Sequence, residues 1–265
     1  MKHVLRWSLR DGLPTLGLWI GGVCVVYIMI VYLFPSLSDL VETYMDESAL
    51  ILAMMGKEAE FLENQNLFDM WLTMEIFSWM GVIISAYVVI YAAGTFSGEV
   101  ESGTMETLLA QPVRRRDVLI GKFSALCVNI AILMAAAYAA IVIAHAIWVD
   151  EPASRGLFAD IFLNNYLLFW CVAGFSFLIS AGADEQKKVI GICMGAVLLT
   201  FMINMVISIA HRMLILAKLT PFYYCDASKV LHRGAIDPVD AVVLFTAGAV
   251  FLAASIFRFE SRDIA

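Results

Sequence analysis

The chain has 265 residues, of which 62% are hydrophobic and only 15% are charged, and its mean hydropathy is +0.84. Soluble domains are about half apolar and about one quarter charged, so this composition excludes an ordinary soluble protein and predicts a polytopic membrane protein. The formal net charge of −7 argues against a nucleic-acid partner.

The first twelve residues are basic and have helical periodicity. Lys2, Arg6 and Arg10 are four residues apart and therefore share one face of a helix. Such a segment is typical of an amphipathic helix that lies in the membrane interface. The alternative is that these basic residues only fix the orientation of the first membrane span.

Long apolar runs divide the chain into six predicted spans within a single transmembrane domain, residues 1–265. A bilayer core requires roughly 20 apolar residues in a helix, and each run is about that long or longer. The fold class is therefore predicted to be all-α and integral to the membrane. The predicted spans are residues 14–34, 72–96, 118–148, 161–181, 189–210 and 238–257.

Two of these spans contain pairs of glycines four residues apart. Gly17 and Gly21 are in the first span, and Gly191 and Gly195 are in the fifth. Small residues at this spacing allow another helix to approach closely. That helix could belong to the same chain or to a second subunit.

Between the first two spans, residues 35–71 are polar and rich in carboxylates. Their apolar stretches are too short to cross a bilayer. We expect one or two amphipathic helices on the outer surface. This acidic region is either a solvated cap or a surface that gathers a cationic substrate.

Residues 97–122 separate the second and third spans and carry charges of both signs, with acidic residues first and basic residues last. Met105, Leu108 and Leu109 have the spacing of one helical face, and Pro112 would end such a helix. Either Gly103 or Thr104 could cap its start. This short helix either docks against a partner or lies on lipid headgroups.

The distribution of basic residues predicts the orientation. More Lys and Arg residues lie on the side of the two termini than on the opposite side. By the positive-inside rule, both termini and residues 97–122 are predicted to be cytoplasmic.

Motifs for catalysis and metal binding are absent from the sequence. There is no Gly-x-x-x-x-Gly-Lys-Ser/Thr motif, so the chain lacks a phosphate-binding loop of that kind. The five cysteines contain no Cys-x-x-Cys pair, and the four histidines have no ligand spacing. We therefore expect no catalytic residue, metal or cofactor in this chain. An intramembrane enzyme is a weaker alternative, and a non-transporting assembly or sensor subunit is another.

The charged segment resembles the loop between the second and third spans of ABC-2 type permeases, the membrane subunits of ATP-binding-cassette exporters. The chain's Pro-Phe-Tyr-Tyr-x-Asp segment and its final Arg-Asp-Ile are also similar to that family. The residues that carry the resemblance in the loop are Glu99, Glu101, Gly103, Thr104, Glu106, Leu108, Leu109, Pro112, Val113, Arg115 or Arg116, Gly121 and Lys122.

The resemblance implies that residues 97–117 form a cytoplasmic coupling segment that contacts a separate ATPase. It implies a plasma-membrane complex of two ATPase subunits, which use ATP and Mg²⁺, and a second permease that is identical or paralogous. The glutamates would pair with basic groups of the ATPase or with residues 114–116. The residues that the resemblance assigns to coupling are Glu99, Glu101, Gly103, Thr104, Met105, Glu106, Leu108, Leu109, Pro112, Arg115 and Arg116. It assigns the first and fifth spans, and with them Gly17, Gly21, Gly191 and Gly195, to the permease dimer interface.

Overall fold

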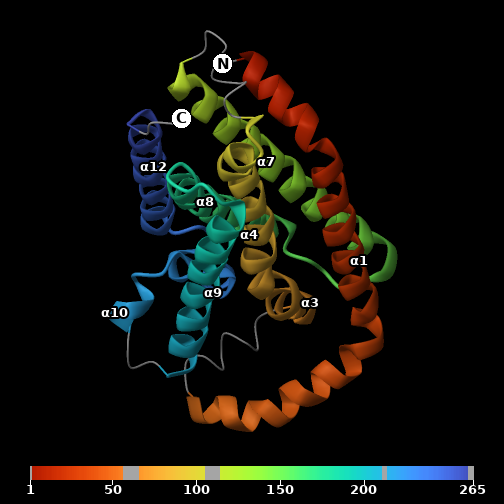
Figure 1. The fold of residues 1–265 in the computed structure, drawn as a ribbon. Helices are drawn as coiled ribbons and strands as arrows, with labels where there is room; N and C mark the ends of the chain where they lie inside the picture. The colour runs from red at the N-terminus through yellow and green to blue at the C-terminus, as the bar shows by residue number, and fades with distance from the viewer. Residues whose placement is uncertain (1, 56–65, 105–113, 211–213, 262–265) are drawn as a thin grey trace.

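The computed structural model describes residues 2–55, 66–104, 114–210 and 214–261, and these residues contain no β-strand. Six of their helices are long and apolar enough to cross a membrane, which confirms the predicted fold class. Figure 1 shows these helices as one bundle, with both ends of the chain drawn at the same end of it.

Helix α1 runs without interruption from Lys2 to Met55 and includes Pro14 and Pro35. The predicted interfacial helix is therefore not a separate element but the first turns of α1. A proline removes one backbone hydrogen bond and tends to kink a helix without always ending it. Figure 1 shows α1 passing along one side of the bundle and bending beneath it.

The second span is one helical run from Leu67 to Glu101 that changes pitch twice. Five segments follow one another along it. They are α3 (Leu67–Leu72), the π-helical η1 (Thr73–Phe77), α4 (Ser78–Ala93), the π-helical η2 (Gly94–Gly98) and α5 (Glu99–Glu101). Single π-turns in α-helices are rare and occur frequently at functional sites.

The other spans are α7 (Arg115–Trp148), α8 (Arg155–Ser180), α9 (Gln186–Ala210) and α12 (Pro238–Glu260). Helix α8 is the most buried of the spans. In its 18-residue apolar stretch, which we call the apolar window, 67% of the residues are buried inside the protein, against 17% for both α9 and α12. Helix α1 packs mainly on α7, and α12 packs mainly on α8. The core of the bundle therefore lies around α8 and α4.

Two glycines allow α8 and α12 to pack closely. A Cβ atom at Gly174 would lie 2.6 Å from the backbone oxygen of Gly248. A Cβ atom at Gly248 would lie 2.2 Å from the Trp170 ring, whose indole nitrogen donates to the Phe245 carbonyl. Backbones can approach this closely only where side chains are absent.

Between α9 and α12, the chain forms α10 (Leu214–Ala217), the 3-10 helix η3 (Pro221–Cys225) and α11 (Ala227–Arg233). The side chain of Asp226 caps α11, which ends at Gly234 with a φ of 71°. Burial lowers the pKa of the Lys229 ammonium below its ordinary value, although the nearby carboxylates of Asp226 and Asp240 oppose this shift.

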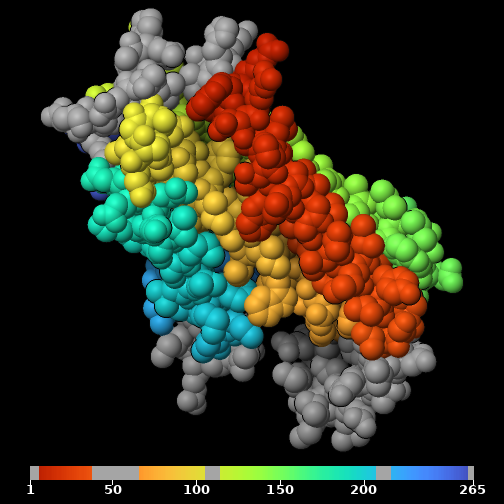
Figure 2. Space-filling model, turned by 45° about the vertical axis from the view of Figure 1, so that its right-hand side comes forward, coloured from red at the N-terminus to blue at the C-terminus, as the bar shows by residue number. Residues whose placement is uncertain are grey.

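Figure 2 shows one face of the molecule on which α1, the second span and α9 lie side by side. Helix α1 crosses this face diagonally, and the second span lies between α1 and α9. Only 22% of the apolar window of α1 is buried. This face therefore presents two poorly buried helices, one on each side of the second span.

Candidate functional site

The candidate site is the end of the second span, residues 94–104, which we call the loop base. It leads into residues 105–113, the segment that contains the predicted short helix and lies outside the described residues. Figure 1 shows the loop base and the start of α7 at the end of the bundle where the two termini are drawn. The loop base, the start of α1 and the end of α12 therefore lie at the same end of the bundle, and the side of the membrane that this end faces stays a prediction.

A buried ion pair joins the loop base to α7. The Lys122 ammonium contacts the Glu99 carboxylate and also donates to the carbonyl oxygen of Thr95 at 2.8 Å. It lies 5.3 Å from the centre of the Phe96 ring. The Lys122 side chain is 1% exposed and that of Glu99 is 19% exposed, so the pair is largely shielded from water. Such pairs restrict geometry, because separating them leaves a charge in an apolar environment.

Glu101 joins the loop base to α9. One oxygen of its carboxylate accepts a hydrogen bond from the backbone amide of Gln186, at 2.9 Å, where α9 begins. A carboxylate at this position satisfies a free amide and interacts favourably with the positive end of the helix dipole. The Gln186 side chain lies over Gly98, where a Cβ atom would be 3.0 Å from its amide oxygen.

Two serines join the loop base to α8. The hydroxyl groups of Ser97 and Ser180 lie 2.9 Å apart, and each also donates to a carbonyl of the second span, Ala93 and Ala92 respectively, at 3.0 Å. All four groups are at or next to the π-turn η2, where the regular ladder of α-helical hydrogen bonds is altered. The serines therefore satisfy backbone groups that this altered pitch affects.

Phe96 extends these contacts to α12. Its ring centre is 4.9 Å from that of Phe259 and 5.4 Å from that of Phe177, both in edge-to-face geometry. Phe177 in turn contacts Phe123 of α7 at 5.2 Å. The loop base is thus connected to α7, α8, α9 and α12, and a displacement of residues 94–104 would disturb all four helices.

The chain leaves the loop base through a turn at Gly103. Its φ of 72° lies in the left-handed region that glycine adopts without strain, and its amide donates to the Val100 carbonyl at 3.1 Å. The hydroxyl of Thr104 donates to the Glu99 carbonyl at 3.3 Å. These bonds fix the direction in which the following segment starts.

A cavity of about 250 Å³ lies beside the ion pair, between α1, the second span and α7. Asp11, Tyr91, Glu99 and Lys122 line it, together with Ser8, whose buried hydroxyl has no hydrogen-bond partner among the described residues. Helix α1 is therefore also placed next to the loop base.

The structure groups some of the predicted coupling residues and leaves others undescribed. Glu99, Glu101, Gly103 and Thr104 all lie in the loop base. At the start of α7, Arg115 is half-buried and Arg116 is exposed. The predicted residues that fall outside the described part of the chain are Met105, Glu106, Leu108, Leu109 and Pro112.

The sequence interpretation missed the partners of the loop base. Lys122 belongs to the family resemblance, but the sequence did not predict its pairing with Glu99. Ser180 and Gln186 were not identified at all. They are 83 and 85 residues away from Ser97 and Glu101, so no local spacing could have indicated these contacts.

Among the residues that the structure describes, none packs against the four predicted interface glycines. A Cβ atom at Gly17, Gly21, Gly191 or Gly195 would meet nothing within 4 Å in the described structure. All four are exposed on α1 and α9, the two helices that flank the second span in Figure 2. Of the two alternatives that the sequence left open, close packing within one chain is not observed among the described residues, and the permease interface stays a prediction.

Comparisons with known proteins agree with this architecture. The family model described as "ABC-2 family transporter protein" matches residues 4–264. A curated relative, the "Probable ABC transporter permease protein NosY" of Stutzerimonas stutzeri, is 28% identical over 130 residues. This alignment covers 47% of the present chain and 46% of the relative, so it spans about half the length of the curated protein.

Proposed function

The chain belongs to the ABC-2 family of transporter proteins, and we propose that it is the membrane permease subunit of an ABC exporter. In this proposal, a separate cytosolic ATPase binds and hydrolyses ATP with Mg²⁺, and the present chain forms the translocation path. Two ATPase subunits and a second permease, identical or paralogous, complete the complex. We propose that the complex lies in the plasma membrane, with both termini of this chain in the cytoplasm.

The observation that carries the proposal is the attachment of the loop base to four other helices. A coupling element transmits work only if it makes different contacts in two states and is held firmly by the part that it moves. Glu99, Glu101 and Ser97 provide such attachments through Lys122, Gln186 and Ser180. We infer that residues 105–113 contact the ATPase and that the loop base passes the resulting displacement to the spans.

The exposed face supports the proposed permease dimer. Helices α1 and α9 are poorly buried and carry glycines at the spacing that favours close helix approach. We propose that a second permease covers this face, with Gly17, Gly21, Gly191 and Gly195 at the contact.

The experiment that tests the function is co-expression of this protein with the candidate cassette-type ATPases of the same organism, followed by purification through a tag on the present chain. We expect the ATPase to co-purify and its activity to change when the complex is reconstituted into vesicles. Deletion of residues 105–110 should abolish co-purification while membrane insertion is retained. Full retention of the ATPase by this deletion variant would contradict the proposed coupling site.

A further inference from the structure

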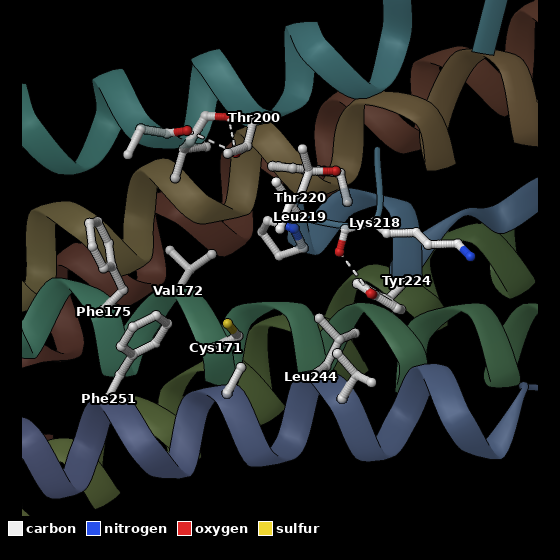
Figure 3. A pocket seen from close by; sticks show the side chains of 16 residues that line it. Cys171, Val172, Phe175, Thr200, Lys218, Leu219, Thr220, Tyr224, Leu244 and Phe251 are labelled. Carbon is white, nitrogen blue, oxygen red and sulfur yellow. Dashed lines mark hydrogen bonds between the residues drawn. The ribbon is translucent and has the colours of Figure 1, made fainter. Parts of the chain in front are cut away.

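At the end of the bundle opposite the loop base, a cavity of about 380 Å³ lies between α8, α9 and α12, beneath the connection that contains η3. Its volume is within the range of roughly 300–1,000 Å³ that is usual for small-molecule sites. Cys171, Val172 and Leu244 form a buried floor, and the rings of Phe175 and Phe251 lie at one end. Figure 3 shows these side chains around the space, with Lys218 and Tyr224 at the other end.

The few polar groups that line this cavity already have partners within the protein. The Thr200 hydroxyl donates to the carbonyls of Ala196 and Val197, and the Thr220 hydroxyl donates to that of Ala217. The Tyr224 hydroxyl donates to the Lys218 carbonyl at 2.7 Å. A polar ligand would find no unsatisfied donor on these side chains, so the interior of the cavity suits hydrocarbon.

The exception is the ammonium group of Lys218, which is exposed at the rim. Two other basic residues of this connection are engaged within the protein: Lys229 donates to the Tyr223 carbonyl, and Arg233 pairs with Asp237. Among the residues that the structure describes, Lys218 has no carboxylate or carbonyl partner. Figure 3 shows its side chain extending beyond Tyr224, away from the two phenylalanines.

We propose that this cavity binds one acyl chain of an anionic phospholipid from the surrounding bilayer, with the phosphate at Lys218. The cavity lies between membrane-spanning helices, and α12, which is outside the proposed permease interface, is only 17% buried in its apolar stretch, so bilayer lipid can reach the cavity along α12. An acyl chain would replace a void with dispersion contacts along Val172 and Leu244. The positive charge at the rim selects the headgroup, because a lysine ammonium near a membrane surface attracts lipids that carry net negative charge. This proposal depends on the membrane-spanning arrangement and is independent of coupling to an ATPase.

The test is native mass spectrometry of the purified full chain with phosphatidylglycerol and phosphatidylcholine that carry identical acyl chains, and with oleate. The wild type should retain one phosphatidylglycerol molecule about fivefold better than phosphatidylcholine, which corresponds to about 1 kcal/mol. Lys218→Gln should reduce this preference to none, whereas Lys187→Gln, an exposed lysine at the other end of α9, should preserve it.

Two variants that fill the cavity test the position of the acyl chain. Ala247→Trp and Ala196→Phe would fill the cavity from opposite walls, and each should remove the retained lipid. Val242→Trp is the matched control, because Val242 lies on the same helix as Ala247 but is 60% exposed and does not line the cavity.

Lipid retention is compared only for blocking variants that elute like the wild type in size-exclusion chromatography, because this elution shows that the variant is folded. Lys218→Gln requires no repacking and keeps the proposal testable if both blocking variants fail to fold. Unchanged lipid retention in a folded blocking variant, an unchanged headgroup preference in Lys218→Gln, or retention of oleate in place of phospholipid would each overturn the proposal.

Discussion

The ammonium group of Lys122 is held against the carboxylate of Glu99, so the first turns of α7 are tied to the last turns of the second span. These two helices lead into and out of residues 105–113. The same ammonium donates to the Thr95 carbonyl, which places the ion pair directly against the π-turn η2. Both ends of the loop are therefore anchored to a single buried point.

Removing one charge of this ion pair should destabilise the protein more than removing both charges. Glu99→Gln leaves the buried Lys122 ammonium without a charged partner and should destabilise the protein by about 3 kcal/mol. The double variant Glu99→Gln/Lys122→Met removes both charges and should recover most of that loss. The measurement is unfolding of the purified protein followed by tryptophan fluorescence. A double variant that is as unstable as the single one would show that the charges do not stabilise each other.

Reversing the charge of Glu101 should separate ATP hydrolysis from transport. Glu101→Lys places a cation at the positive end of α9 and removes the acceptor for the Gln186 amide, so the junction between the loop base and α9 should loosen. We expect normal membrane insertion and ATPase association but a lower ratio of transport to hydrolysis in reconstituted vesicles. Glu101→Gln is the control, since its side-chain oxygen can still accept the hydrogen bond. Unchanged transport in Glu101→Lys would contradict the coupling role.

Cysteine crosslinking should locate the permease interface on the face formed by α1 and α9. In a background without the five native cysteines, Gly17→Cys and Gly191→Cys should each give an intermolecular product on mild oxidation. Both positions are exposed and have room for the new side chain. Val250→Cys, on the exposed side of α12, should remain monomeric on denaturing gels. Absence of product at both glycines, with efficient crosslinking at Val250, would place the interface elsewhere.

The contact between α8 and α12 should be intolerant of a single methyl group. Gly174→Ala would place a Cβ atom 2.6 Å from the Gly248 carbonyl, so the two backbones would have to move apart. Overpacking of this kind costs about 1–3 kcal/mol. Gly191→Ala is the control, because a Cβ atom there meets nothing within 4 Å. Thermal unfolding in detergent should show a lower midpoint for Gly174→Ala only, and equal midpoints would contradict the close packing.

The sequence alone predicted the all-helical fold and its six spans, because a bilayer imposes a long apolar run on every crossing helix. It did not predict that α1 would continue through Pro14, because a proline usually marks a helix boundary. A helix can continue through a proline where its neighbouring turns and packing hold it. The contacts of the loop base could not be predicted in the same way. Pairs such as Ser97 with Ser180 depend on how helices pack, and that information is not contained in local periodicity.

The π-turn η2 also determines the direction in which the side chains of the following residues, Glu99–Glu101, point around the helix axis. An α-helix turns by about 100° and rises by about 1.5 Å with each residue, and a π-turn accommodates one residue more than an α-turn. If Gly94–Gly98 kept all its residues but adopted regular α pitch, Glu99 and Glu101 would rotate by roughly that angle about the helix axis. They would then no longer face Lys122 and the Gln186 amide, so the orientation of both glutamates depends on the wider π-turn.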